Sequence, residues 1–156
     1  MPGEADAQDE HRARIRALGE QFMRLVPHNN ALGMEVVALA EGRAEFRLPY
    51  AERLVGNPET GVLHGGAISA LMDATCGAAV FQALARPMTI ATLDLRIDYL
   101  KPAAPGRDVV ARAHCYKVTR DIAFVRGVAF HDDEADPIAT SAGTFMLGTR
   151  SGKGGP

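Results

Sequence analysis

Hydrophobic and polar residues alternate with different periods along the chain, and these periods predict its elements. Over residues 9–26 apolar side chains recur every three or four positions among charged ones, which predicts an amphipathic surface helix ending before Pro27. Two apolar runs, 34–39 and 43–49, flank the turn 40–42 and predict a hairpin of two strands.

A long loop follows, and the next stretch, 66–85, contains Asp73 as its only charged residue. The stretch predicts a helix of about 30 Å. Because it is apolar on nearly every side, we expect it to be buried. A transmembrane helix is the weaker interpretation, since a central carboxylate is costly in lipid and the rest of the chain has the composition of a soluble protein.

After Pro87 the period changes to two, which indicates a half-buried strand that stops at Lys101. Its alternating apolar residues are Leu93, Leu95, Ile97 and Tyr99. Three further strands are predicted at 107–119, 122–131 and 137–148. The order of helix, two strands, long helix and four strands predicts an α+β fold, in which a curved antiparallel sheet wraps around the buried helix.

Composition narrows the class of protein. The 156 residues, 47% of them hydrophobic, suffice for one domain, which we place at 9–148 between flexible tails at 1–8 and 149–156. A net charge of −2 argues against a nucleic-acid partner. Cys76 and Cys115 lie apart in apolar segments, which is typical of free thiols in the cytoplasm, and we expect no metal site. The charged first thirty residues do not resemble a signal peptide.

Two features could carry chemistry. The first is His64-Gly65-Gly66 at the start of the buried helix, where backbone N–H groups lack intrahelical partners and attract anions. The N–H of Gly65 is a candidate donor to an oxyanion, although two glycines can also simply make a tight turn. The second is Asp73, since buried carboxylates concentrate at functional sites.

Other interpretations of these residues remain open. Asp73 could form an interface ion pair with Arg86 or Arg96. The small residues on its helix face could leave space for a substrate or only allow close packing; they are Gly66, Ala70 and Gly77.

The spacing of Gly65 and Asp73 bears on assembly. Eight residues separate them, about 12 Å along a helix axis, too far for both to act on one carbonyl group. A two-fold dimer with antiparallel helices would bring Gly65 of one chain to Asp73 of the other, giving two equivalent sites.

These residues resemble a known family, the hotdog-fold acyl-CoA thioesterases, in particular the phenylacetate-pathway subgroup. The resemblance spans roughly residues 30–148, and is carried by Asn57-Pro58, Gly61, Leu63-His64-Gly65-Gly66, Asp73 nine positions after the histidine, and the strand 92–103. It implies a helix wrapped by a curved sheet, dimers or tetramers with sites at the dimer interface, and an acyl-CoA substrate.

The resemblance also implies roles for individual residues. Asp73 matches the nucleophile or general base, and Gly65 the oxyanion donor, assisted by His64. Thr92 matches a hydroxyl that helps to place water. Asn57 matches an asparagine that orients water or the carbonyl, but it lies seven residues before His64 instead of six.

No cofactor is expected, since a thioester is an activated acyl group that one carboxylate and one oxyanion donor can hydrolyse. Whether Asp73 attacks directly or activates water stays open. Gly66 would approach the substrate, and several basic residues could meet the coenzyme A phosphates, with Arg120 favoured; they are Lys101, Arg107, Lys117, Arg120 and Arg126. The acyl group, and the choice between dimer and tetramer, are not predicted.

Four alternatives are weaker. An α/β-hydrolase is excluded because no GxSxG motif is present, and the acidic turn 132–136 lacks the glycine and glutamate of a calcium loop. A hydratase of the same fold would need a histidine where Ala78 stands. A non-catalytic acyl-CoA binding module is ranked below both enzymes, because Asp73 is retained.

Overall fold

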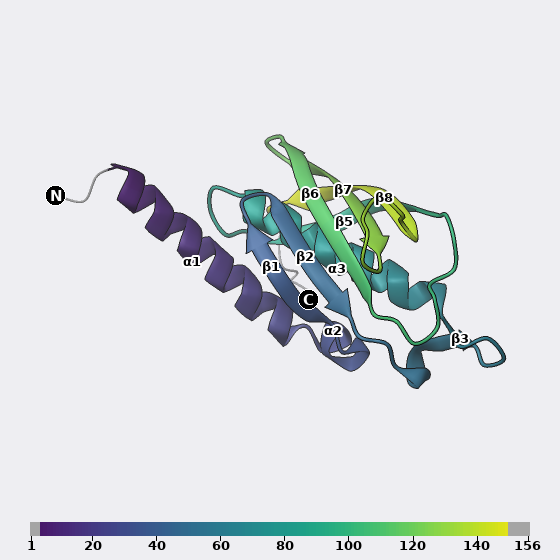
Figure 1. Ribbon diagram of the computed structural model, residues 1–156. Helices are drawn as coiled ribbons and strands as arrows, with labels where there is room; N and C mark the ends of the chain where they lie inside the picture. The colour runs from purple at the N-terminus through teal and green to yellow at the C-terminus, as the bar shows by residue number, and fades with distance from the viewer. Residues whose placement is uncertain (1–3, 150–156) are drawn as a thin grey trace, which may run out of the picture.

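The computed structural model describes residues 4–149 and confirms the α+β architecture (Figure 1). A long helix, α3 (Gly65–Ala83), lies against one face of an antiparallel sheet with the strand order β1-β2-β6-β7-β8-β5. The strands of this sheet are β1 (Glu35–Ala40), β2 (Arg43–Leu48), β5 (Ile90–Tyr99), β6 (Val109–Val118), β7 (Ile122–Phe130) and β8 (Ala139–Leu147).

The predicted strands are all present, and the main corrections concern short elements. The N-terminal helix α1 (Glu4–Leu25) begins five residues before the predicted start and includes residues 4–8, which the sequence analysis assigns to a flexible tail. A second helix, α2 (Pro27–Leu32), follows with proline in its first turn, where no N–H is needed. The predicted C-terminal tail lies, except for Thr149, outside the described residues.

The long loop before α3 also has regular structure. It contains a short 3₁₀ helix, η1 (Glu52–Leu54), and a small hairpin formed by β3 (Val55–Asn57) and β4 (Val62–Leu63). This hairpin projects from the end of the molecule where α3 begins (Figure 1). Elements of two or three residues are too short to produce a periodic pattern, which is why the sequence did not reveal them.

The core lies between α3 and the sheet. Side chains of Leu71, Met72, Cys76 and Val80 on α3 are fully buried against strand residues such as Phe46. Most contacts of α3 are with β6, β2 and β7. Close packing of this kind fixes the axial position of the helix, and therefore of the groups that it carries.

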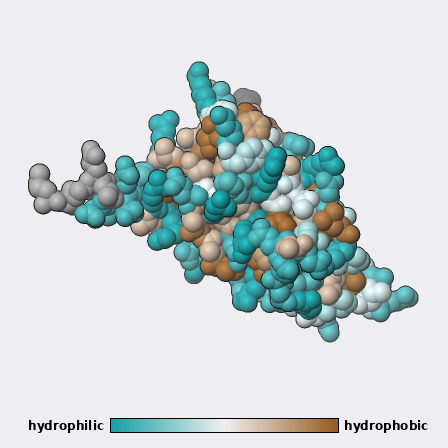
Figure 2. Space-filling view, turned by 45° about the horizontal axis from the view of Figure 1, so that its top comes forward, coloured by the Kyte–Doolittle hydropathy of each residue, from teal (hydrophilic) through white to brown (hydrophobic). Residues whose placement is uncertain are grey.

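Helix α1 extends beyond this core. Its buried residues Ile15 and Met23 face the body of the protein, while its N-terminal half protrudes (Figure 1). Figure 2 shows mainly hydrophilic residues around that protruding end. None of the helices in residues 4–149 combines the length and apolar character needed to cross a membrane.

One side of α3 is left open by its own sheet. Gly65 and Gly66 are exposed, and Ala70 and Asp73 are half-buried. The adjacent edge strand, β5, is ten residues long and has exposed apolar side chains at Leu93 and Tyr99, with Leu100 just beyond its end. A long edge strand of this kind can pair with another strand.

Candidate active site

The start of α3 is shaped by His64. This residue is the N-cap of the helix, and its Nδ1 accepts a hydrogen bond of 2.8 Å from the N–H of Gly66. A Cβ atom at position 66 would lie only 2.8 Å from Nδ1, so glycine is needed there for the cap to form. No described residue accepts a hydrogen bond from the N–H of Gly65, which therefore stays free for a ligand.

Strand β5 also contacts the first turn of α3, through Tyr99. The hydroxyl of Tyr99 donates to the carbonyl of Gly65 at 2.7 Å and lies 2.6 Å from Oγ of Ser69. Neither side chain was predicted to belong to the site, and the contact of Tyr99 with the first turn of α3 follows only from the sheet order.

Asp73 meets Thr92 farther along the same strand. Oγ1 of Thr92 donates to Oδ1 of Asp73 at 2.9 Å. Within residues 4–149 of one chain Asp73 forms no ion pair, and Arg96 binds Asp98. An ion pair of Asp73 across an interface stays a prediction. Within its own described chain, Asp73 is thus a half-buried carboxylate with a hydroxyl partner and no neutralising cation.

A β-bulge explains how Thr92 reaches Asp73. Strict alternation would turn Leu93 toward α3 and Thr92 away from it. The register shifts at this point, so that Thr92 pairs with the buried Phe145 and Asp94 pairs with Thr144. Cross-strand partners share a face of the sheet, and the extra residue therefore turns Thr92 toward α3.

Asn57 organises its own turn. Its Oδ1 accepts from the N–H of Glu59 at 3.0 Å, and its carbonyl accepts from the N–H of Gly61 at 2.8 Å. The β3–β4 pairing has a register shift between Val55 and Asn57. Asn57 is exposed on the projecting hairpin, and its role in a site stays a prediction.

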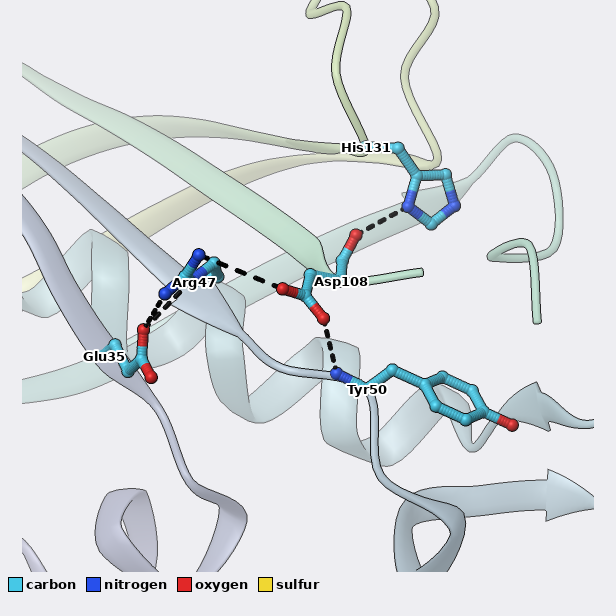
Figure 3. A network of polar contacts seen from close by, with 5 residues as sticks. All are labelled: Glu35, Arg47, Tyr50, Asp108 and His131. Carbon is cyan, nitrogen blue, oxygen red and sulfur yellow. Dashed lines mark hydrogen bonds and ion pairs between the residues drawn. The ribbon is translucent and has the colours of Figure 1, made fainter. Parts of the chain in front are cut away.

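A polar network supports the segment that leads to this hairpin (Figure 3). Nε of Arg47 donates to Glu35 at 2.9 Å, and this hydrogen bond raises the pKa of Arg47 above its usual value. Asp108 accepts the N–H of Tyr50 at 2.8 Å through its carboxylate, and its carbonyl lies 2.7 Å from Nδ1 of His131. Hydrogen bonds therefore join strand β2 to β1, and the loop at Tyr50 to the segments at Asp108 and His131.

Tyr50 connects this network to the β3–β4 hairpin. Its hydroxyl donates to the carbonyl of Gly61 at 2.9 Å. At the base of the hairpin, a Cβ atom on Gly56 would lie 2.8 Å from Cα of His64, so only glycine permits this close approach. A cavity of about 290 Å³ adjoins His64 and Gly66 and is lined in part by Leu32, Leu54 and Val55.

Three of the candidate basic residues, Arg120, Lys101 and Arg126, differ in their surroundings. Arg120 is almost fully exposed at the β6–β7 turn, with Asp121 as a distant partner at 3.9 Å. Lys101 binds Asp136. Arg126 lies over the ring of Tyr116, 5.0 Å from its centroid. Arg120 thus has the freest charge of the three, and its contact with phosphate stays a prediction.

The cysteines are not candidates for a nucleophile. Both are free and buried. Burial raises the pKa of the Cys76 thiol to about 12, and it also raises the pKa of Cys115. Both are neutral thiols at ordinary pH and react slowly. The described residues also contain no group of three or more His, Cys, Asp or Glu side chains able to hold a metal ion.

Comparison with known proteins identifies the class. The family described as Thioesterase superfamily matches residues 60–138. The medium/long-chain acyl-CoA thioesterase YigI of Escherichia coli K12 is 31% identical over 147 residues, which cover 86% of this chain and 94% of that protein. The chain belongs to the Thioesterase superfamily.

Solved structures agree with this assignment. A crystal structure of a Pseudomonas aeruginosa protein is 45% identical, with a TM-score of 0.77, and the match covers 85% of this chain and 98% of that chain. A mutant of the phenylacetic acid degradation protein PaaI from Thermus thermophilus is 27% identical, with a TM-score of 0.68, over 78% of this chain and 98% of that chain. The predictions of a hotdog fold and of a thioester hydrolase are confirmed.

Proposed function

We propose that this protein hydrolyses acyl-CoA thioesters to a free acid and coenzyme A, with Asp73 of one subunit and the Gly65 N–H of a second subunit at each site. The observation that carries the proposal is the half-buried Asp73 carboxylate, which has a hydroxyl partner in Thr92 and forms no ion pair within residues 4–149. The name of YigI, a medium/long-chain acyl-CoA thioesterase, supports an acyl-CoA substrate, and the name of PaaI, a phenylacetic acid degradation protein, adds an aromatic acid as a candidate acyl group.

The two groups are sufficient for the reaction. As a general base, Asp73 takes a proton from water while the oxygen of that water adds to the thioester carbonyl carbon. The carbonyl oxygen becomes negative and accepts a hydrogen bond from the N–H of Gly65. Collapse of this intermediate breaks the C–S bond, and the proton held by Asp73 passes to the departing thiolate. In direct attack, the Asp73 carboxylate adds to the carbonyl carbon with the same oxyanion donor, and the C–S bond breaks to give a mixed anhydride and the coenzyme A thiolate. Water then hydrolyses the anhydride, which regenerates the Asp73 carboxylate and releases the acid, and the thiolate takes up a proton.

The edge strand β5 supports the assembly. Thr92, near its start, touches Asp73, and Tyr99, at its end, touches Gly65. If two copies pair through β5 around a two-fold axis between Leu95 and Arg96, Thr92 of one copy lies opposite Tyr99 of the second. That pairing brings Asp73 of one chain toward Gly65 of the other, and it covers the exposed apolar residues of the edge.

Removing the Thr92 hydroxyl should slow the reaction. We expect Thr92→Val, which keeps the β-branched shape, to lower kcat about tenfold, equivalent to about 1.4 kcal/mol of barrier, because Asp73 loses its orienting donor. Thr92→Ser keeps the hydroxyl and serves as the control. Equal kcat values for the valine and serine variants, measured by steady-state thiol release, would contradict this role.

A substrate panel tests the proposed function. Acetyl-, octanoyl-, palmitoyl- and phenylacetyl-CoA are each mixed with the protein and a thiol-reactive dye, whose background is low because both cysteines are buried. We expect catalytic thiol release with at least one ester. Calorimetric binding of every ester without thiol release would instead indicate a binding module. In a separate assay with an enoyl-CoA, loss of the enoyl absorbance without thiol release would indicate a hydratase.

A further inference from the structure

We infer that Tyr99 is a positioning residue, which holds the first turn of α3 so that the N–H of Gly65 points at the substrate carbonyl. The inference rests on the proposed function, in which Gly65 is the oxyanion donor. It assigns to the last residue of β5 a task in catalysis, carried out without contact with the reacting atoms.

The hydrogen bonds at Tyr99 and Ser69 converge on the carbonyl of Gly65. The phenol of Tyr99 donates its one proton to this carbonyl at 2.7 Å. Oγ of Ser69 donates to the same carbonyl at 3.2 Å and lies 2.6 Å from the phenol oxygen. The bond from Tyr99 is the shorter of the two, and it is the one that comes from outside α3.

The peptide that Tyr99 holds needs an external restraint. Its N–H, from Gly66, donates to Nδ1 of His64, and its carbonyl, from Gly65, accepts from Tyr99, so both ends are fixed. Glycine has the widest backbone freedom of all residues, and two glycines in succession at a helix end can tilt. Within the described chain, Tyr99 is the one residue outside α3 found to hydrogen-bond to Gly65.

The position of Tyr99 on a strand gives this restraint its precision. Strand β5 is paired with β8 along its whole length, from Ile90 with Leu147 to Tyr99 with Ala139. The same strand carries Thr92, the partner of Asp73. One rigid strand therefore positions both the Asp73 carboxylate and the Gly65 amide of its chain. A displacement of about 1 Å in such groups can lower the rate as much as 10²-fold.

The test compares Tyr99→Phe with a matched control, Tyr116→Phe. Tyr116 is exposed to the same degree, 49% against 48% for Tyr99, and no described residue hydrogen-bonds to its hydroxyl. We expect Tyr99→Phe to lower kcat roughly tenfold with KM changed less than about twofold, because the substrate still binds but the oxyanion is poorly stabilised. Tyr116→Phe should match the wild type.

Three other outcomes would overturn the inference. A wild-type kcat for Tyr99→Phe would show that Tyr99 has no role. A raised KM at constant kcat would indicate a role in substrate binding, and recovery of activity at high protein concentration would indicate a role in assembly. If the wild type releases thiol and Asp73→Asn does not, while Tyr99→Phe is fully active, the proposed function stands and only this inference fails.

Discussion

Asp73→Asn should reduce kcat for thioester hydrolysis by about 10²- to 10⁴-fold, the range that general-base catalysis supplies. The amide cannot accept a proton from water or attack a carbonyl. Its oxygen can still accept the hydrogen bond that Thr92 now donates at 2.9 Å, so the fold and the assembly should be retained.

The matched control for this variant is Asp94→Asn. Asp94 lies on the same strand as Thr92, beyond the bulge and on the opposite face of the sheet. Steady-state kinetics with the best ester of the panel, together with circular dichroism and size-exclusion chromatography, should show loss of activity in the first variant alone. An Asp73→Asn protein that turns over at the wild-type rate would rule out Asp73 as base or nucleophile.

The second large effect concerns the backbone. Gly65→Pro should lower kcat by about 10²- to 10³-fold, because proline removes the one N–H that we assign to the oxyanion. The site tolerates the substitution. Gly65 is the first residue of α3, where proline is favoured, and His64 before it has φ −60° and ψ 132°, the extended conformation that proline requires of its predecessor.

Gly65→Ala is the matched control, since alanine keeps the N–H. Its Cβ atom would lie 3.6 Å from the Tyr99 hydroxyl, an ordinary contact. We expect the alanine variant to retain far more activity than the proline variant at equal thermal stability. Equal activities for the two would show that the amide of Gly65 does not stabilise the transition state.

The candidate chemistry was visible in the sequence because it consists of local signals. Asp73 is the only charge in an apolar helix, and His64-Gly65-Gly66 directly precedes that helix. A period of two, or of three to four, needs only neighbouring residues to be read, and so helices α1 and α3 and the strands of the main sheet were also predicted, with boundaries a few residues off.

The arrangement around these residues could not be read in the same way. The bulge at Leu93 reverses the side-chain alternation of β5, and alternation alone would have pointed Thr92 away from Asp73. The contact between Tyr99 and Gly65 depends on β5 being the edge strand beside the start of α3, which follows from the order of the whole sheet. Both are properties of pairing between distant segments.

The central claim, that each site combines Asp73 of one chain with Gly65 of the other, is tested most directly by mixing two inactive variants. Asp73→Asn and Gly65→Pro, co-expressed with different tags and purified through both, give mixed dimers. One site then contains both defects, and the other contains neither. We predict about half of the wild-type activity per mixed dimer, in proportion to one intact site of two. Mixed dimers as inactive as either parent would contradict a site shared between subunits.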